Sequence, residues 1–389
     1  MLEDGCIQEH LKQEKLAKYN NDQYQTLLDL YTALLHEYED FLYFATQHLS
    51  ATPATRRLPK EYNLPARLWS HGIQGLLTIL YSRSPASLDY VVVFIQTAYS
   101  TMTLFLETVP TFEDTWTECL GDLARYRMAI EDSFTDKEIW AQVARQWYLK
   151  SANLSPKIGR LYHHLAILAH PDPLPQLLYY GKSLAVPIPF TAARESIMTL
   201  FEPTPVAGIS AVITAVVRSH AIIFTGQSLD TFDETLGEIK NNLDGYIALI
   251  TKKYSEQGYC LAISNCIALL GYGAEDNPLA LLLRPQSADA DTIMPDADSA
   301  SSPAPPPTFT AALRLFIQTT KIHLLRIGDT NTLSFLHVTL VLIHCLAEQP
   351  AAASLIYPHF PWTSLVRFLN ALAVLPPPNR AAIDRKSVV

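Results

Sequence analysis

Apolar residues recur at steps of three and four along most of the chain, and prolines or short polar joints separate one such stretch from the next. The pattern is clearest over residues 112–190, where three helical patterns follow one another with tight joints. This spacing places apolar side chains on one face of an α-helix, whereas a half-buried strand alternates with a period of two. Strand-type alternation is hard to find, and the chain has only 14 glycines among its 389 residues. The sequence therefore predicts an all-α fold.

Each periodic stretch predicts one helix, and the breaks follow proline and helix-capping chemistry. Residues 1–20 predict a fraying lead-in helix and 22–49 a long amphipathic helix, while 50–63, with Pro53 and Pro59, predict a loop. Pro65 suits the first turn of the next helix. The remaining predicted helices run through about 65–80, 92–106, 113–131, 136–152, 157–169, 173–185, 189–202, 207–226, 230–251, 256–271, 308–327, 332–347 and 362–374.

Length, charge and cysteine usage narrow the class of protein. A chain of 389 residues exceeds one ordinary hydrophobic core, which predicts two domains or a long solenoid. The net charge of −9 disfavours strong general nucleic-acid binding but leaves room for a local nucleic-acid groove. The five cysteines form no CxxC pair, the chain starts without an apolar signal segment, and no apolar run is long enough to span a membrane. These features predict a cytoplasmic and nuclear protein without a membrane partner.

A change in composition near residue 285 organises the second half of the chain. Residues 285–307 are rich in serine, alanine, aspartate and proline and lack aromatic residues, so they predict a disordered segment that cannot offset its ordering entropy. Apolar helices resume at 308, so we interpret the segment as an insertion within a domain. The predicted organisation is an N-terminal domain over 1–205, a C-terminal helical domain over 206–375 and a disordered tail over 376–389.

Two patterns in the central helices carry most of the information. The run from Gly121 to Arg127, Gly-Asp-Leu-Ala-Arg-Tyr-Arg, places arginines in a mostly apolar helix, where arginine is rarely buried unless it is paired. The second pattern is close to the tetratricopeptide helix–turn–helix signature, in which small residues let two helices approach and proline marks the turns. It comprises Trp147, Tyr148, Ala152 and Pro156 followed by Gly159, Tyr162, Leu165 and Ala166, whose aromatic, leucine and alanine members we interpret as core.

These patterns, together with Tyr-Tyr-Gly-Lys-Ser-Leu-Ala over 179–185, resemble the EST/SMG family of telomerase-associated proteins and nonsense-mediated-decay adaptors. The Thr-Phe-Glu-Asp-Thr-Trp run over 111–116 resembles the fungal branch most closely. The resemblance is strong over about 65–205, fair to 270 and weak over 308–372. It implies a 14-3-3-like helical domain with tetratricopeptide repeats, followed by a helical hairpin domain.

The resemblance also implies a phosphate-binding pair. In the 14-3-3-like fold, an arginine and a tyrosine on one helix join a basic residue of a neighbouring helix to bind phosphoserine, and the matching positions are Arg125 and Tyr126. A guanidinium binds phosphate as a planar fork, and a tyrosine hydroxyl adds a donor. The alternative is that Arg125 only pairs with Asp122, three residues earlier, or with an acid on a neighbouring helix.

The neighbouring-helix position departs from the family pattern. Where the resembled phosphoserine-binding adaptors have lysine, this chain has Gln74, which donates a hydrogen bond but brings no charge. Arg67 and His71 lie about two turns and one turn earlier on the same predicted helix, and we expect them to share its face and to substitute for the lysine. His71 adds charge only when protonated. The predicted phosphopeptide-binding residues are Arg125, Tyr126, Arg67, His71 and Gln74.

Other candidate chemistry is sparse. Lys150, Lys157 and Arg160 are surface candidates for a peptide groove, because stacked helix pairs form concave surfaces. The adjacent His163 and His164 point about 100° apart on a helix and lack the HExxH spacing, so no metal site is expected. No phosphate-binding loop, GxSxG or GxGxxG motif stands in a strand–helix context, so we expect neither a cofactor nor an enzyme.

The leading interpretation is a non-catalytic adaptor that binds a partner protein segment, phosphorylated or unmodified. The resemblance implies a role in RNA surveillance or telomere maintenance, and a heterodimer with a related adaptor is compatible with it. The first alternative is a module that binds RNA or single-stranded DNA. A steep decrease of binding affinity with salt concentration would support it. The second alternative is a helical scaffold whose binding is indifferent to phosphate.

Overall fold

The computed structural model describes residues 19–202, 208–284 and 305–374. These residues form helices joined by short connections, and their only β pairing is an isolated bridge between Ile158 and Ile188. The all-α prediction is therefore confirmed. The predicted lead-in helix, most of the predicted insertion and the predicted tail lie outside the described residues.

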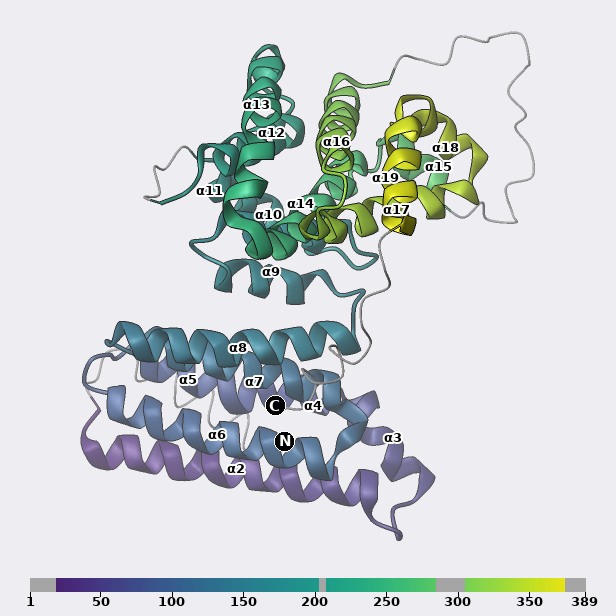
Figure 1. Ribbon diagram of the computed structural model, residues 1–389. Coiled ribbons are helices and arrows are strands. Elements are labelled where there is room, and N and C mark those ends of the chain that lie inside the picture. The colour runs from purple at the N-terminus through teal and green to yellow at the C-terminus, as the bar shows by residue number, and fades with distance from the viewer. Residues whose placement is uncertain (1–18, 203–207, 285–304, 375–389) are drawn as a thin grey trace. The chain divides into compact units, whose positions relative to one another are not determined.

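Internal contacts divide the chain between Pro156 and Lys157 into two compact units, which are described separately. Over its described residues, 19–156, the N-terminal unit contains nine helical segments (Figure 1). They are α2 (Asn21–Gln47), α3 (Pro53–Glu61), α4 (Leu64–Arg67), the π-helix η1 (Leu68–Gln74), α5 (Gly75–Tyr81), α6 (Leu88–Thr108), the 3-10 helix η2 (Pro110–Phe112), α7 (Glu113–Ile130) and α8 (Phe134–Leu154).

The C-terminal unit contains the remaining helices, which are joined by short 3-10 turns. The α-helices are α9 (Gly159–Leu168), α10 (Pro173–Ala185), α11 (Ala193–Phe201), α12 (Ala211–Thr225), α13 (Phe232–Ile250), α14 (Tyr254–Leu269), α15 (Pro278–Leu283), α16 (Pro307–Leu325), α17 (Leu333–Ala347), α18 (Pro350–Ile356) and α19 (Trp362–Val374). The 3-10 turns are η3 (Leu229–Thr231), η4 (Thr251–Lys253), η5 (Gly271–Gly273), η6 (Thr330–Thr332) and η7 (Tyr357–His359).

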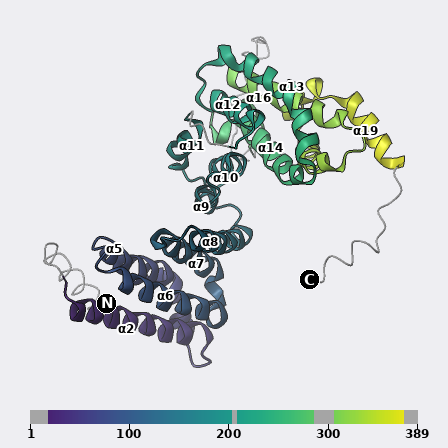
Figure 2. The same ribbon diagram turned by 60° about the vertical axis from the view of Figure 1, so that its left-hand side comes forward.

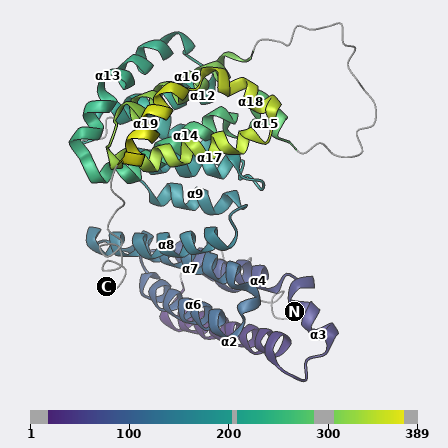
Figure 3. The same cartoon turned by 45° about the vertical axis from the view of Figure 1, so that its right-hand side comes forward.

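The N-terminal unit is a layered bundle in which α2, α6, α7 and α8 run side by side (Figures 1 and 3). A capping box starts α2, because Asn20 accepts from the Gln23 backbone N–H and Gln23 reaches back to the Asn20 backbone N–H. Trp116 of α7 is fully buried, stacks on Phe105 of α6 at 4.8 Å, and donates from Nε1 to the Val109 carbonyl. The apolar faces predicted from the three-and-four spacing are the faces that form this core.

The C-terminal unit is built around α14, which contacts α10, α12, α16 and α17 (Figures 2 and 3). Leu177 and Leu184 of α10 belong to the same core as Leu261 of α14 and Phe316 of α16. Because α10 is part of this core, residues 157–202 group with the C-terminal helices, and the contact boundary at 156 differs from the predicted domain boundary at 205. That 1–205 folds as one domain stays a prediction.

The sequence analysis missed three short helices that begin with proline. Residues 50–63 were expected to be a loop, which is wrong over Pro53–Glu61, where Thr52 caps α3 by accepting from the Thr55 N–H. Helices α15 and α18 likewise open at Pro278 and Pro350 and were not predicted. Proline lacks a backbone N–H, but N–H groups in the first turn of a helix have no intrahelical acceptor. Proline can therefore start these helices, although it was predicted to break them.

Two helical segments are long and apolar enough to cross a membrane by length and composition alone, Leu88–Thr108 and Thr330–Ala347. Both contribute side chains to a hydrophobic core, including Phe94 and Phe105 in the first and Phe335 and Leu336 in the second. Core burial accounts for part of this apolarity, since 39% of the first apolar window and 33% of the second are buried. One or two such segments are weak evidence for a membrane span. The absence of a membrane partner stays a prediction.

Candidate phosphate-binding site

Helices α7 and α8 approach most closely where Gly121 faces Tyr148. A Cβ atom on Gly121 would lie 2.8 Å from Cε1 of Tyr148, which is closer than carbon atoms pack. Glycine therefore lets the tyrosine ring lie against the α7 backbone. Tyr148 is fully buried, and its hydroxyl is held at the polar end of the contact, next to Asp122.

A three-residue network forms at this contact. The Tyr148 hydroxyl donates to Oδ1 of Asp122 at 2.6 Å, and Nη2 of Arg125 donates to the same oxygen at 3.0 Å. Nε of Arg125 donates to the Tyr148 oxygen at 3.3 Å, which closes the triangle. Burial, followed by the neighbouring Asp122 carboxylate, raises the pKa of Tyr148. Burial lowers the pKa of Arg125, but Tyr148 and Asp122 raise it by more, so the arginine stays charged.

The network leaves part of the guanidinium available. Arg125 pairs with Asp122, as the alternative interpretation expects, yet the arginine side chain remains 33% exposed. A guanidinium has five N–H donors. The two contacts above use two of them, and the other three bond to no acceptor among residues 19–202, 208–284 and 305–374. The geometry therefore presents a fixed, charged donor group at the surface of α7.

Tyr126 lies beside the guanidinium but is fixed through its backbone. The Tyr81 hydroxyl at the end of α5 donates to the Tyr126 carbonyl at 2.6 Å, and the two rings lie 5.5 Å apart. Burial, with Tyr126 as the next cause, raises the pKa of Tyr81 to about 12. The Tyr126 ring centroid is 5.8 Å from the Arg125 guanidinium carbon. Arg127 points elsewhere, toward Glu131 and the Trp140 ring, as its helical position predicts.

The segment that carries Arg67, His71 and Gln74 is not a continuous α-helix. α4 ends at Arg67, the π-helix η1 follows, and α5 begins at Gly75. A π-helix closes i→i+5 hydrogen bonds, so residues seven apart no longer overlie one another as they do in an α-helix. Arg67 is half-buried, whereas His71 and Gln74 are both exposed. The single predicted helix is therefore interrupted here, and a shared face for Arg67, His71 and Gln74 stays a prediction.

The three groove candidates fall in different parts of the chain. Lys150 of α8 forms an ion pair with Glu113 of α7 at 2.9 Å within the N-terminal unit. Lys157 and Arg160 are exposed residues at the start of the C-terminal unit. Each is described only within its own unit, so a groove that combines them stays a prediction. His163 contacts Ser196 at 3.0 Å, and the described part of the chain holds no cluster of His, Cys, Asp or Glu arranged for a metal.

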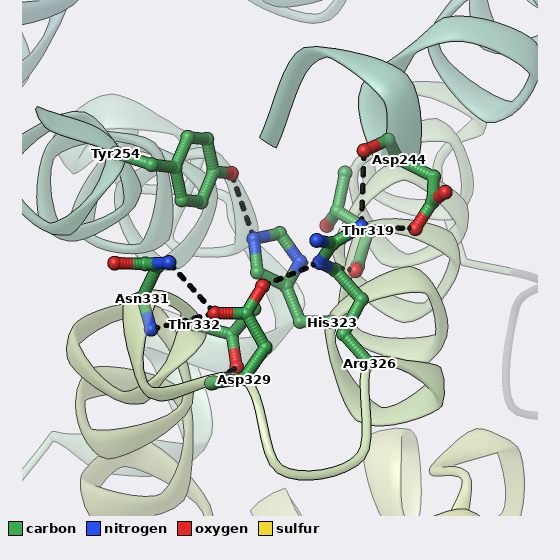
Figure 4. A network of polar contacts seen from close by, with 8 residues as sticks. All are labelled: Asp244, Tyr254, Thr319, His323, Arg326, Asp329, Asn331 and Thr332. Carbon is green, nitrogen blue, oxygen red and sulfur yellow. Dashed lines mark hydrogen bonds and ion pairs between the residues drawn. The ribbon is translucent and has the colours of Figure 1, made fainter. Parts of the chain in front are cut away.

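A second polar centre, which the sequence analysis did not find, lies in the core of the C-terminal unit. His323 of α16 is fully buried, contacts the Tyr254 hydroxyl through Nε2 at 2.7 Å, and stacks on Phe335 at 3.6 Å (Figure 4). Its Nδ1 lies 2.7 Å from the Thr319 carbonyl, so Nδ1 carries the proton and Nε2 accepts from Tyr254. Burial lowers the pKa of His323 to about 4, so the ring is neutral at physiological pH.

The same centre continues to a second buried histidine. His220 of α12 contacts the Tyr272 hydroxyl and the Asn265 side-chain oxygen, and Asn265 donates to the Thr319 hydroxyl at 3.0 Å. Burial lowers the pKa of His220 to about 4 as well. Thr319 thus links both histidines into one hydrogen-bonded chain. The sequence alone does not reveal these hydrogen bonds, because a histidine among apolar helix residues carries no mark of its partners on other helices.

Arg326, at the end of α16, anchors the edge of this centre. It donates from Nη1 to Asp244 of α13 at 2.6 Å and from Nε to Asp329 at 2.8 Å (Figure 4). Asp329 also accepts from the backbone and side chain of Asn331, and it thereby caps the turn η6 before α17. With two carboxylates on it, Arg326 serves the packing of α13, α16 and α17 and is a poor candidate for an external anion.

The described residues thus form an all-α protein in which Asp122 and Tyr148 hold a partly exposed arginine on α7. Residues 144–270 match the family described as Est1 DNA/RNA binding domain. Telomerase-binding protein EST1A of Danio rerio is 43% identical over 86 residues, which cover 22% of this chain and 5% of that protein. EST/SMG-like protein 2 of Saccharomyces cerevisiae is 25% identical over 197 residues, which cover 47% of this chain and 16% of that protein. Nonsense-mediated mRNA decay factor SMG7 of Danio rerio is 28% identical over 148 residues, which cover 36% and 11%.

These matches confirm that the chain is related to the EST/SMG family. The matched segments span between 5% and 16% of the length of these three relatives. The nearer resemblance to the fungal branch, the 14-3-3-like arrangement and the tetratricopeptide repeats stay predictions.

Proposed function

We propose that the chain is a non-catalytic adaptor that binds a phosphorylated segment of a partner protein at Arg125. The observation that carries the proposal is the Arg125 side chain, one-third exposed, which Asp122 and Tyr148 hold in place while three of its donors meet no acceptor in the described part of the chain. A pre-organised arginine loses little side-chain entropy when it binds a phosphate. The relatives named for telomerase binding and for nonsense-mediated decay support a role in one of these two processes, in the cytoplasm and nucleus.

The local charge limits the affinity that this site can reach. Asp122 and Glu131 offset the charges of Arg125 and Arg127, so these two arginines add little net positive charge to the site. Gln74 contributes a neutral donor where the resembled adaptors have a lysine. We therefore propose a modest phosphate contribution, of the order of one charge-assisted hydrogen-bonded contact, about 1.5–3 kcal/mol.

The test is fluorescence anisotropy with a phosphoserine peptide library and an unphosphorylated copy. Arg125→Gln is expected to lower phosphopeptide affinity by about tenfold or more, because 1.4 kcal/mol corresponds to tenfold. Arg127→Gln is the matched control, since it makes the same change two residues away on another face of α7. Circular dichroism checks that both variants fold. Equal binding of both libraries to the unmodified chain would favour the phosphate-independent scaffold and contradict the proposal.

A second candidate function, binding of RNA or single-stranded DNA, is favoured by a cluster in the matched segment 144–270. Lys182 of α10 lies 4.2 Å from the Tyr162 ring centroid and forms no ion pair with any carboxylate among the described residues. Burial lowers the pKa of Lys182. Burial raises the pKa of Tyr162, with Tyr259 and Tyr179 as further causes, so the three phenols lie near one another. Tyr259 is 44% exposed and offers a ring on which a base can stack.

This candidate is tested with an oligouridylate of about 12 nucleotides at two salt concentrations. Binding should weaken steeply with salt, and Tyr259→Ala should lower it by about 1–3 kcal/mol, the contribution of one stacked base. Tyr62→Ala, which removes an exposed tyrosine of the N-terminal unit, is the control. Salt-independent binding, or equal effects of the two substitutions, would exclude this site.

A further inference from the structure

A groove runs along α16 of the C-terminal unit, and its other wall is α18 with the turn η7. Its volume is about 420 Å³, within the range of binding pockets for drug-sized ligands. Its apolar lining comes from Phe309, Leu313 and Ile317 of α16 and Leu355 of α18. These three α16 residues recur every four positions and form one continuous stripe.

Among the described residues, two cationic side chains line the groove, Arg314 and Lys321 of α16, and no carboxylate does. His359 of η7 lines it as well. Arg314 forms an ion pair with Asp233 of α13, whereas Lys321 is exposed and pairs with no described carboxylate. In a chain with a net charge of −9, this surface stands out as locally basic.

The dimensions suit a helix. From Phe309 to Lys321, twelve residues at a rise of 1.5 Å give a length of about 18 Å, or a little over three helical turns. A helix that lies in such a groove places apolar side chains at i, i+4 and i+7 against the stripe. Its flanking side chains then face the rim, where Thr310, Gln318 and Ser354 add polar groups.

We propose that this groove binds a short amphipathic helix of a partner protein, with apolar side chains on the Phe309–Leu313–Ile317 stripe and acidic side chains toward Lys321 and Arg314. Charge complementarity selects an acidic helix, because the described lining contains Lys321 and Arg314 and no carboxylate. Phosphate recognition fits less well, since Asp233 already engages the one arginine. The site lies in the unit that does not contain Arg125, so the proposal does not rest on phosphate binding.

The test uses a designed, side-chain-stapled helix of about four turns with leucine at i, i+4 and i+7 and glutamate on both flanks. Its twin carries lysine in place of every glutamate. Anisotropy with the full chain should show the acidic helix binding at least tenfold more tightly than the basic one. Equal affinity for the two helices, or no binding of either, would overturn the proposal.

Two substitutions place the helix in the groove. Lys321→Glu should weaken the acidic helix about tenfold and strengthen the basic twin, because it reverses the charge at the rim. Lys240→Glu makes the same change at an exposed position of α13 outside the groove lining and should change neither affinity. Equal effects of the two substitutions would show that only the overall charge matters, which would contradict a specific site.

A third peptide separates a partner from the chain itself. Residues 286–300 hold four aspartates and end a few residues before Pro305, which lines the groove. A synthetic peptide of this segment should compete with the acidic helix at least tenfold less well than the unlabelled helix does. Equal competition would assign the groove to the chain's own segment and overturn the partner proposal.

Discussion

Two polar networks, one in each unit, use similar residues in opposite ways. In the N-terminal unit, Asp122, Tyr148 and Arg125 meet at the edge of the α7–α8 contact, and the arginine stays 33% exposed. In the C-terminal unit, His220 and His323 are fully buried and bonded to tyrosine hydroxyls. The first network holds a charge at the surface, whereas the second keeps its histidines neutral and enclosed.

The difference shows which polar cluster is available to a ligand. A buried network whose donors and acceptors are matched has nothing left to offer, and its members stabilise one packing arrangement. A network at the edge of a helix contact orients a side chain and still leaves donors open. Changes to each network test this contrast through the free energy of unfolding and through ligand affinity.

Among the single substitutions, the largest effect is expected from His323→Ala. The change empties the space against Phe335 and leaves the Tyr254 hydroxyl and the Thr319 carbonyl without their partner. Replacing a buried ring by alanine costs roughly 3–5 kcal/mol of unfolding free energy. Hydrogen exchange of α16 and α17 reports on this unit alone. His337→Ala, at an exposed position of α17, is the control and should change stability by less than about 0.5 kcal/mol.

Acid should loosen the C-terminal unit through the same two histidines. Burial lowers the pKa of His220 and of His323 from 6.5 to about 4, so between these values the unfolded chain binds protons that the folded chain does not. Stability is therefore full above about pH 6.5 and falls as the pH drops toward 4, by about 3 kcal/mol for each histidine.

The measurement is hydrogen exchange of α12 and α16 across this pH range, corrected for the intrinsic pH dependence of exchange. His220→Gln removes one titrating group, so it should be less stable than the unmodified chain at pH 7 but lose about half as much on acidification. An unchanged loss in the variant would show that other groups cause the acid sensitivity.

Tyr148→Phe tests the edge network with a smaller change. The ring and its contact with Gly121 remain, while Asp122 and Nε of Arg125 lose a partner. We expect a loss of about 1–3 kcal/mol in unfolding free energy, the cost of a buried polar group left without its bond. Phosphopeptide affinity should also fall, because the guanidinium keeps its contact with Asp122 but loses the one with Tyr148. Tyr43→Phe, at an exposed position of α2, is the control for chemical denaturation. A stability loss without any change in affinity would assign Tyr148 to folding alone.

Most of the helices were predictable because local spacing defines them. The three-and-four step of apolar residues indicated α2, α6, α7 and α10 close to their observed limits. The errors came from backbone chemistry that this step does not encode. Pro53 starts a helix, and the π-helix Leu68–Gln74 interrupts the helix predicted over 65–80.

The candidate site was predictable only where its contacts are local. The pairing of Arg125 with Asp122 follows from their three-residue spacing on one helix. The hydroxyl of Tyr148, 26 residues from Asp122, joins them only because α8 packs on α7 at Gly121. Tyr148 was correctly placed in the core, and the missing step was that a buried tyrosine hydroxyl needs a partner. His220 and His323 were missed because their partners come from other helices.

The smallest effect is expected from Lys150→Ala, which removes an exposed ion pair with Glu113. Both side chains are nearly half exposed, at 46% and 40%, so solvent screens their attraction. Surface pairs of this kind contribute about 0–1 kcal/mol, and the unfolding free energy should change by no more than that. The substitution nevertheless separates stability from binding, because Lys150 is also a groove candidate. Loss of partner-peptide affinity at unchanged stability would assign Lys150 to recognition. If neither the unfolding free energy nor the peptide affinity changes, Lys150 is a solvated residue of α8. In the N-terminal unit, Arg125 would then be the residue that distinguishes a ligand-accessible network from the enclosed one.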